Sequence, residues 1–298
     1  MKEEVRDLQQ QLEAVGYVAD RSLATALVLL RRLARPLLIE GDAGVGKTEV
    51  AKALAQVLST SLIRLQCYEG LDTASAVYEW NYQHQLLTIK LQEQQSRSVA
   101  DREAEIFSER YLLARPLLKA ITQEVAPVLL IDEVDRADEE FEAYLLEVLS
   151  EFQISIPELG TMRARSIPLV ILTSNATREL SDALRRRCLY HFLDYPSRAK
   201  ELEIVMRRVP GIEPRLGEQV VSFVQNVRGM DLRKRPGIAE TLDWAAALMN
   251  LGLNTLDDDP EAVRDSLTCL LKTREDRARI DDQGVAAVLA QAALGGGD

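Results

Sequence analysis

The segment with the clearest chemical pattern is GDAGVGKT, which fits the spacing G-x-x-x-x-G-K-[ST]. Glycines in such a loop let the backbone curl so that successive N–H groups point at phosphate oxygens. Lys47 supplies a mobile positive charge to the β- and γ-phosphates, and Thr48 offers a hydroxyl to Mg²⁺. The pattern predicts binding of ATP with Mg²⁺ by residues Gly41, Asp42, Ala43, Gly44, Val45, Gly46, Lys47, Thr48 and Glu49.

A pair of carboxylates, Asp132 and Glu133, follows the wholly apolar run 128–131. Such a run is typical of a strand buried on both faces of a parallel sheet. Ligands of these sheets bind beyond the carboxyl ends of the strands, so we expect the pair to face the same crevice as the phosphate loop. Asp132 would hold Mg²⁺ through water, and Glu133 would orient and deprotonate the attacking water. This chemistry is hydrolysis of ATP.

Two further polar features have both a functional and a structural interpretation. Asn175 follows the apolar run 169–172, where its amide could hold the attacking water or the γ-phosphate, but asparagine also favours turns. The run Arg185, Arg186 and Arg187 is either a solvated helix end or the source of an arginine that reaches the nucleotide of a neighbouring subunit. The second interpretation requires an oligomer.

The elements expected to position these residues alternate between strand and helix. Short apolar runs predict the strands, and apolar side chains at helical spacing predict the helices. The expected strands are 37–39, 62–67, 128–131 and 169–172, and the expected helices are two before residue 36, one after the loop and one at about 139–152. This alternation predicts an α/β domain over residues 1–195, with a parallel sheet covered by helices on both faces.

The pattern changes after Tyr195. Residues 196–298 contain no convincing strand and several amphipathic helices broken at glycine and proline, so we expect a second, all-helical domain. Within the first domain, residues 153–165 predict a hairpin that turns near Leu159–Gly160. Residues 92–105 are polar and fit either a solvated helix face or a mobile insert.

Composition narrows the class of protein. A net charge of -11 argues against broad nucleic-acid binding, although Arg228, Arg233, Lys234 and Arg235 could form a local basic patch. The 3 cysteines and 2 histidines lack metal-site spacing, and we expect the cysteines to be buried as small hydrophobic residues. The N-terminus has no apolar signal core, and no run approaches a membrane span. We therefore expect a cytoplasmic protein without a membrane span.

The order of these motifs resembles the AAA+ ATPases over most of the chain: GDAGVGKT, LLIDEVDRAD, LTSNATREL and DALRRRC. That superfamily has a P-loop αβα domain followed by a small helical lid. Within it, the chain resembles the MoxR branch, and most closely the CoxD-type members encoded with aerobic carbon monoxide dehydrogenases. This finer resemblance is carried by LQCYEGLD, YEWNYQHQLL, LLARPLLKAI, EFQISIPELGT and LRKRPGIAETLDWA.

The resemblance implies a role for each candidate residue. Lys47 and Thr48 match the Walker A motif, Asp132 and Glu133 match Walker B, and Asn175 matches sensor 1.

The arginine finger and sensor 2 are also implied by resemblance. Arg187 is the best match to the finger, with Arg186 second. Where many MoxR proteins carry Ser-Pro-Arg as sensor 2, this chain has Arg235-Pro236-Gly237, so either Arg235 or Arg233 takes that role. Val18 and Arg235 complete the expected nucleotide contacts.

The resemblance implies partners as well. Such ATPases form rings, commonly hexamers, and often act as chaperone-like remodellers with a protein that carries a von Willebrand A domain. An insert at about 68–91 and the hairpin at 153–165 would face the pore or a partner. The implied client is an immature molybdenum hydroxylase, carbon monoxide dehydrogenase, whose copper- and molybdenum-containing centre is being matured. A nucleic-acid motor or loader and a nucleotide-gated assembly scaffold with slow hydrolysis are the alternatives.

Overall fold

The computed structural model of the chain describes residues 1–92 and 104–283. The chain divides into two compact units. The first comprises Met1–Leu8, Arg21–Glu40 and Val50–Phe192. The second comprises Gln9–Asp20, Gly41–Glu49 and Leu193–Asp298, of which 284–298 lie outside the described residues.

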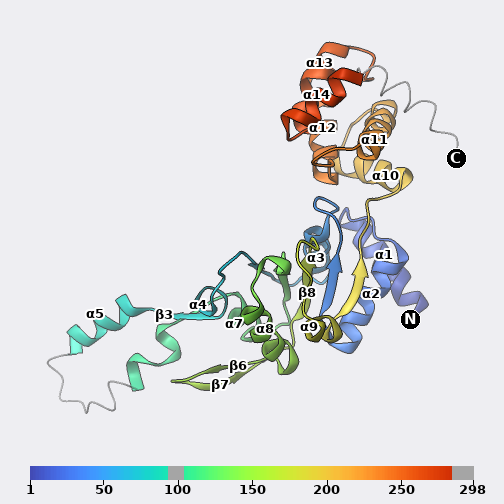
Figure 1. The fold of residues 1–298 in the computed structure, drawn as a ribbon. Coiled ribbons are helices and arrows are strands. Elements are labelled where there is room, and N and C mark those ends of the chain that lie inside the picture. The colour runs from blue at the N-terminus through green and yellow to red at the C-terminus, as the bar shows by residue number, and fades with distance from the viewer. Residues whose placement is uncertain (93–103, 284–298) are drawn as a thin grey trace. The chain divides into compact units, whose positions relative to one another are not determined.

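The first unit is built on a five-stranded parallel sheet with the order β2-β5-β8-β1-β9, and Figure 1 labels its central strand β8. Its strands are β1 (Leu37–Glu40), β2 (Leu62–Gln66), β5 (Val128–Asp132), β8 (Leu169–Ser174) and β9 (Leu189–Phe192). The register sets Gln66 opposite Asp132 and Glu40 opposite Ser174. The carboxyl ends of neighbouring strands therefore lie side by side, which is where parallel sheets carry their sites.

Helices surround this sheet. The first unit contains α2 (Arg21–Leu33), α4 (Thr73–Ala76), α5 (Tyr82–Gln92), α7 (Pro116–Ile121), α8 (Glu139–Glu151) and α9 (Asp182–Arg187), with 3-10 turns at Glu109–Tyr111 and Val134–Arg136. Helix α2 packs on β1, β8 and β9, and α7 packs on β2 and β5. Two more helices, α1 (Lys2–Ala14) and α3 (Lys47–Val57), each have residues in both units.

The sheet is buried on both faces. Leu38, Leu129 and Leu172 belong to one apolar core with residues of α7 and α8. The adjacent residues Ile39 and Leu130 are fully buried as well. Because successive side chains of a strand point to opposite faces, both faces of the sheet are covered. This arrangement confirms the α/β prediction.

Two small antiparallel sheets accompany the main one (Figure 1). The expected hairpin is confirmed as β6 (Gln153–Ile156) and β7 (Gly160–Arg163), in which Gly160 has a φ of 81°. In the other sheet, β3 (Tyr78–Trp80) pairs with β4 (Leu112–Ala114). Residues 93–103 of the polar segment lie outside the described residues.

The second unit is helical beyond Leu193. Its helices are α10 (Arg198–Arg208), α11 (Pro214–Gly229), α12 (Ile238–Asn250), α13 (Pro260–Ser266) and α14 (Arg274–Gln283), with a 3-10 turn at Leu267–Cys269. Phe223 and Trp244 lie at the centre of its apolar core, and the Trp244 indole donates to Ser266 Oγ over 2.8 Å. Between residues 193 and 283 there is no strand, as the sequence predicts.

The burial of the cysteines agrees with the expectation for two of the three residues. Cys67 and Cys188 are buried, whereas Cys269 is partly exposed. Strand β9 was not predicted, because its four residues alternate in exposure along an edge and contain no continuous apolar run. Among the described helices, none has the length and apolar character needed to cross a bilayer.

Candidate functional site

The glycine-rich loop lies in the second unit and leads into α3, which begins at Lys47. Gly44 and Gly46 have φ angles of 83° and 95°, in the region that glycine adopts without a steric penalty. The ammonium of Lys47 donates to the carbonyl oxygens of Gly41 and Asp42 over 2.6 and 2.7 Å. A curled backbone, a lysine charge along it and a helix N-terminus after it form a cradle that fits phosphate groups.

The first turn of α12 packs directly on this loop. A Cβ atom on Gly237 would lie 2.7 Å from Gly44 Cα, and a Cβ atom on Gly44 would lie 2.8 Å from Gly237 Cα. The backbone N–H of Ile238 donates to the Gly44 carbonyl over 2.9 Å. The Glu240 carboxylate accepts from Gly237 N over 3.0 Å and so caps the helix. Positions 44 and 237 therefore both require glycine, because a Cβ atom at either one would collide with the backbone of the other.

Tyr195 contacts the loop from another direction. Its hydroxyl donates to the Ala43 carbonyl over 3.3 Å. Burial raises the pKa of the Tyr195 phenol, and the charge of Asp42 raises it further, so the hydroxyl remains a donor. The Arg228 guanidinium lies 4.8 Å from the centre of the Tyr195 ring and forms a buried ion pair with Glu201 at 2.6 Å. Arg228 also donates to the Pro236 carbonyl over 2.7 Å, which ties both loop contacts to one buried network.

The remaining expected nucleotide contacts are peripheral to this network. Arg235 is exposed, and its charge opposes the rise in the Tyr195 pKa that burial and Asp42 cause. Arg233 is exposed and pairs with Glu275 at 3.3 Å. Val18 is partly buried in the connector between α1 and α2.

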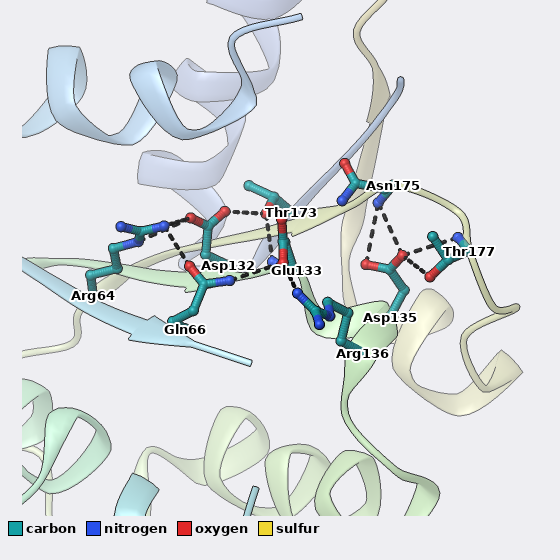
Figure 2. A network of polar contacts seen from close by, with 9 residues as sticks. All are labelled: Arg64, Gln66, Asp132, Glu133, Asp135, Arg136, Thr173, Asn175 and Thr177. Atoms are coloured by element: carbon teal, nitrogen blue, oxygen red, sulfur yellow. Dashed lines mark hydrogen bonds and ion pairs between the residues drawn. The ribbon is translucent and has the colours of Figure 1, made fainter. Parts of the chain in front are cut away.

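The acidic pair lies in the first unit, at the carboxyl end of β5 (Figure 2). Asp132 Oδ2 accepts from Arg64 Nε and Nη2 over 3.0 and 2.5 Å, and Oδ1 accepts from Thr173 Oγ1 over 2.5 Å. Arg64 and Thr173 come from β2 and β8, the strands on either side of β5. The Asp132 side chain is 3% exposed. Each carboxylate oxygen is therefore fixed by a neighbouring strand.

Glu133 is held differently from its neighbour. Its φ is 55°, a left-handed conformation that is uncommon outside glycine and that turns the chain out of the strand. Gln66 Nε2 and Arg136 Nη1 each donate to Glu133 Oε2 over 3.1 Å, while the side chain stays 33% exposed. Gln66 in turn accepts from Arg64, so the two carboxylates share one network (Figure 2). Glu133 is positioned and still accessible to water.

Asp135 organises the loop after β8. It is buried and accepts from Asn175 N over 3.2 Å, from Thr177 N over 3.0 Å and from Thr177 Oγ1 over 2.6 Å. Burial alone would raise the pKa of the Asp135 carboxyl, but these hydrogen bonds outweigh burial and hold its pKa below the ordinary value. The Asn175 amide points away from Asp135 (Figure 2). Asp135 therefore fixes the backbone that carries Asn175.

The three arginines of α9 have separate surroundings. Arg185 turns inward and pairs with the buried Glu40 at 3.2 Å. Arg186 is exposed and pairs with Asp182 at 2.8 Å. Arg187 is exposed as well, and its guanidinium donates to Ser150 Oγ. Arg186 and Arg187 thus lie exposed on the surface, whereas the Arg185 side chain is partly buried.

Sequence reasoning missed the residues that support this site. Within the first unit, Thr173 links Asp132 to Glu133, and Asp135 separately holds the backbone of Asn175. Gln66, Arg64, Thr177 and Tyr195 were not predicted either. The signal for Arg64 and Gln66 was present, because they interrupt an otherwise apolar strand at alternate positions. No group of three or more His, Cys, Asp or Glu in the described part of the chain could hold a metal ion.

Comparison with known proteins gives a family match and distant relatives. The family described as AAA domain (dynein-related subfamily) matches residues 36–188. An uncharacterized protein of Staphylococcus aureus is 26% identical over 226 residues, covering 74% of this chain and 77% of that protein. An uncharacterized protein of Staphylococcus haemolyticus is 24% identical over 239 residues, covering 78% and 82%. The solved structure of the Thermotoga maritima RuvB Holliday junction branch migration motor aligns with a TM-score of 0.45 and 18% identity, over 92% of this chain and 80% of that one.

Proposed function

Since the chain belongs to the AAA domain family, in its dynein-related subfamily, we propose that it is a Mg²⁺-dependent ATPase that remodels a protein client. The observation that carries the proposal is the setting of Glu133, a carboxylate held by two donors and 33% exposed at the end of a buried strand. The adjacent Asp132 is buried and fixed on both of its oxygens. The exposed Glu133 carboxylate is therefore suited to a water molecule, whereas Asp132 would take a metal in place of Arg64 on its Oδ2 atom.

The loop residues would bind the triphosphate. Lys47 donates to two loop carbonyls, and the phosphates would take the place of those acceptors. Thr48 and Asp132 would hold Mg²⁺, which when bound neutralises phosphate charge. Val18 and Arg235 would contact other parts of the nucleotide.

Glu133 and Asn175 would act on the attacking water. The Glu133 carboxylate would accept the proton from the water and align its oxygen with the γ-phosphate. Asn175, held by Asp135 through its backbone, would present its amide to the same water or to the γ-phosphate. General-base assistance of this kind contributes about 10²- to 10⁴-fold to a rate.

An arginine from a second copy would complete the site. Arg187, or Arg186 beside it, is exposed on α9 and would stabilise the charge of a neighbour's reacting phosphate. Because a neighbouring copy supplies this arginine, hydrolysis would depend on assembly of several copies of the chain. We propose that this assembly is a hexameric ring. This part of the proposal is supported by the family and by the exposure of both side chains.

The client is proposed from the resemblance of five sequence segments to CoxD-type proteins. It would be an immature molybdenum hydroxylase, carbon monoxide dehydrogenase, recruited together with a von Willebrand A domain protein. The alternative of a nucleic-acid motor depended on a basic patch that included Arg228. Arg228 is buried against Glu201, so it is not available to such a patch.

Phosphate release by the purified chain tests the activity. Release should require Mg²⁺ and should disappear in Lys47→Ala, which removes the charge that lies along the loop. Retention of Mg²⁺-dependent release in Lys47→Ala would contradict the site. For the client, a Glu133→Gln chain loaded with ATP should capture a molybdenum hydroxylase or a von Willebrand A protein from a native extract, whereas capture of nucleic acid alone would favour the motor.

A further inference from the structure

Arg35 holds the end of the helix that carries the arginine run. It lies between α2 and β1. Its Nη2 donates to the carbonyl oxygens of Arg186 and Cys188 over 2.8 and 3.3 Å, and its Nε donates to that of Arg187 over 3.2 Å. One guanidinium therefore binds three consecutive carbonyls at the C-terminus of α9.

A second contact fixes the same helix from inside. Arg185 Nη2 lies 3.2 Å from Glu40 Oε1, and the Glu40 side chain is 8% exposed. Glu40 is the last residue of β1, and Arg35 precedes that strand by two residues. Residues on either side of β1 therefore hold the C-terminal half of α9. In addition, the backbone N–H of Leu189 donates to the Pro36 carbonyl over 2.7 Å.

These contacts fix the C-terminal end of α9. The last carbonyls of a helix have no donor within the helix, and a cation beside them also interacts favourably with the helix dipole. Helix α9 has only 6 residues, too few to hold its direction without tertiary contacts. A planar guanidinium can serve three acceptors at once, which a lysine ammonium does with poorer geometry.

We propose that Arg35 is a positioning residue for the arginine that acts in trans. By fixing the backbone of Arg186 and Arg187, it sets the direction in which their side chains leave α9 and reach a neighbouring copy's nucleotide. This inference rests on the proposed function, in which one of those arginines completes the neighbour's site. Among the described residues, the hydrogen bonds of the Arg35 guanidinium all go to backbone carbonyls, so the role proposed for it is positioning and not catalysis.

The test uses mixtures of full-length variant chains, in which each chain is inactive or weak alone. Arg35→Ala should bind ATP within about twofold of wild type and hydrolyse it about 100-fold more slowly, since small misplacement of a catalytic group has effects of that size. Mixed with Lys47→Ala, which retains a well-placed arginine run, Arg35→Ala should regain activity. Mixed with Arg187→Ala, it should regain none, because neither chain then offers a competent arginine.

Controls separate the possible failures. Arg31→Ala, an exposed residue of α2, should behave as wild type. Thermal unfolding and ATP binding show whether Arg35→Ala folds. If it does not, Arg35→Lys replaces it in the same mixtures, with a smaller expected loss of hydrolysis. A Glu40 variant would not be a suitable control, because Glu40 adjoins Gly41 and its replacement would disturb the phosphate loop as well.

Two outcomes would overturn the inference, and they are distinguishable. If Arg35→Ala restores activity to Arg187→Ala, then Arg35 acts on its own chain's nucleotide, and the inference fails while the trans arginine stands. If Arg187→Ala and Lys47→Ala fail to restore each other, the shared site itself is wrong, and the inference falls with it.

Discussion

Thr173 Oγ1 lies 2.5 Å from Asp132 Oδ1 and donates a hydrogen bond to it (Figure 2). Thr173 Oγ1 also accepts a hydrogen bond from the backbone N–H of Glu133 over 2.9 Å. One hydroxyl on β8 therefore fixes the side chain of the first acidic residue and the backbone of the second. The two carboxylates are placed by their neighbouring strand as well as by their own.

Replacement of Thr173 by valine keeps the shape of the side chain and removes the hydroxyl. We expect Thr173→Val to lower kcat about tenfold or more, because both carboxylates lose a positioning hydrogen bond, while ATP affinity changes by less than about twofold. Thr173→Ser should retain most of the activity. Steady-state kinetics and equilibrium binding measure the two quantities, and equal activity of the valine and serine variants would contradict the role of the hydroxyl.

Arg64 occupies the Asp132 oxygen that Mg²⁺ would bind in the proposed site. Its guanidinium donates twice to Oδ2 of that buried carboxylate. We expect Arg64→Met to lower the Mg²⁺ concentration for half-maximal hydrolysis by about twofold to fivefold, the range for a partly exposed ion pair. A titration of Mg²⁺ at saturating ATP measures this shift, with Arg31→Met as the matched control. A requirement for more Mg²⁺ would show instead that Arg64 orients Asp132 for the metal.

The contact between Gly44 and Gly237 allows a matched pair of glycine substitutions. In Gly237→Ala, the new methyl group would lie 2.7 Å from Gly44 Cα and from the Gly44 carbonyl oxygen, so the loop must move. We expect ATP affinity to fall about tenfold or more. Gly229→Ala, at the end of α11, places its methyl group in open space and should bind normally. Unchanged affinity in Gly237→Ala would show that binding tolerates displacement of the loop.

Asp135 links stability to pH. Its pKa is lowered in the folded chain, so its stabilising contribution is complete above the unfolded pKa of about 4 and is lost as the pH falls through the folded pKa. We expect Asp135→Asn to lower the free energy of unfolding by about 1–3 kcal/mol near neutral pH, because acceptors of buried donors are lost.

This difference between Asp135→Asn and wild type should shrink below about pH 4, where the wild-type carboxylate also gains a proton. Urea unfolding of both chains across this range measures it. The exposed Asp231→Asn should show little difference from wild type at any pH. A constant difference down to low pH would mean that the Asp135 carboxylate charge is not the stabilising feature.

The sequence predicts the elements that are local. The loop, the acidic pair and the buried strands are each encoded in a few consecutive residues, and the hairpin at 153–165 follows from one turn and two short alternating strands. The structure has all of these elements. Strand β9 was not predicted, because a strand at the edge of a sheet does not need a continuous apolar run.

The supporting contacts could not be predicted, because they depend on which elements become neighbours. Arg64 and Asp132 are 68 residues apart in the chain, and Arg64 reaches Asp132 only because β2 lies beside β5. The approach of Gly237 to Gly44 likewise depends on the packing of α12 rather than on either local segment. Sequence pattern indicates which residues carry chemistry, whereas strand order and packing determine what holds them.

The most direct test of the account is a comparison of ATP binding and phosphate release in the Glu133→Gln chain. Glutamine keeps the size of the side chain and one oxygen that can accept from Gln66 and Arg136, but it cannot take a proton from water. We expect ATP to bind within about twofold of wild type and single-turnover phosphate release to fall by about 100-fold or more. Phosphate release near the wild-type rate would show that Glu133 does not activate the water, and it would contradict the central assignment.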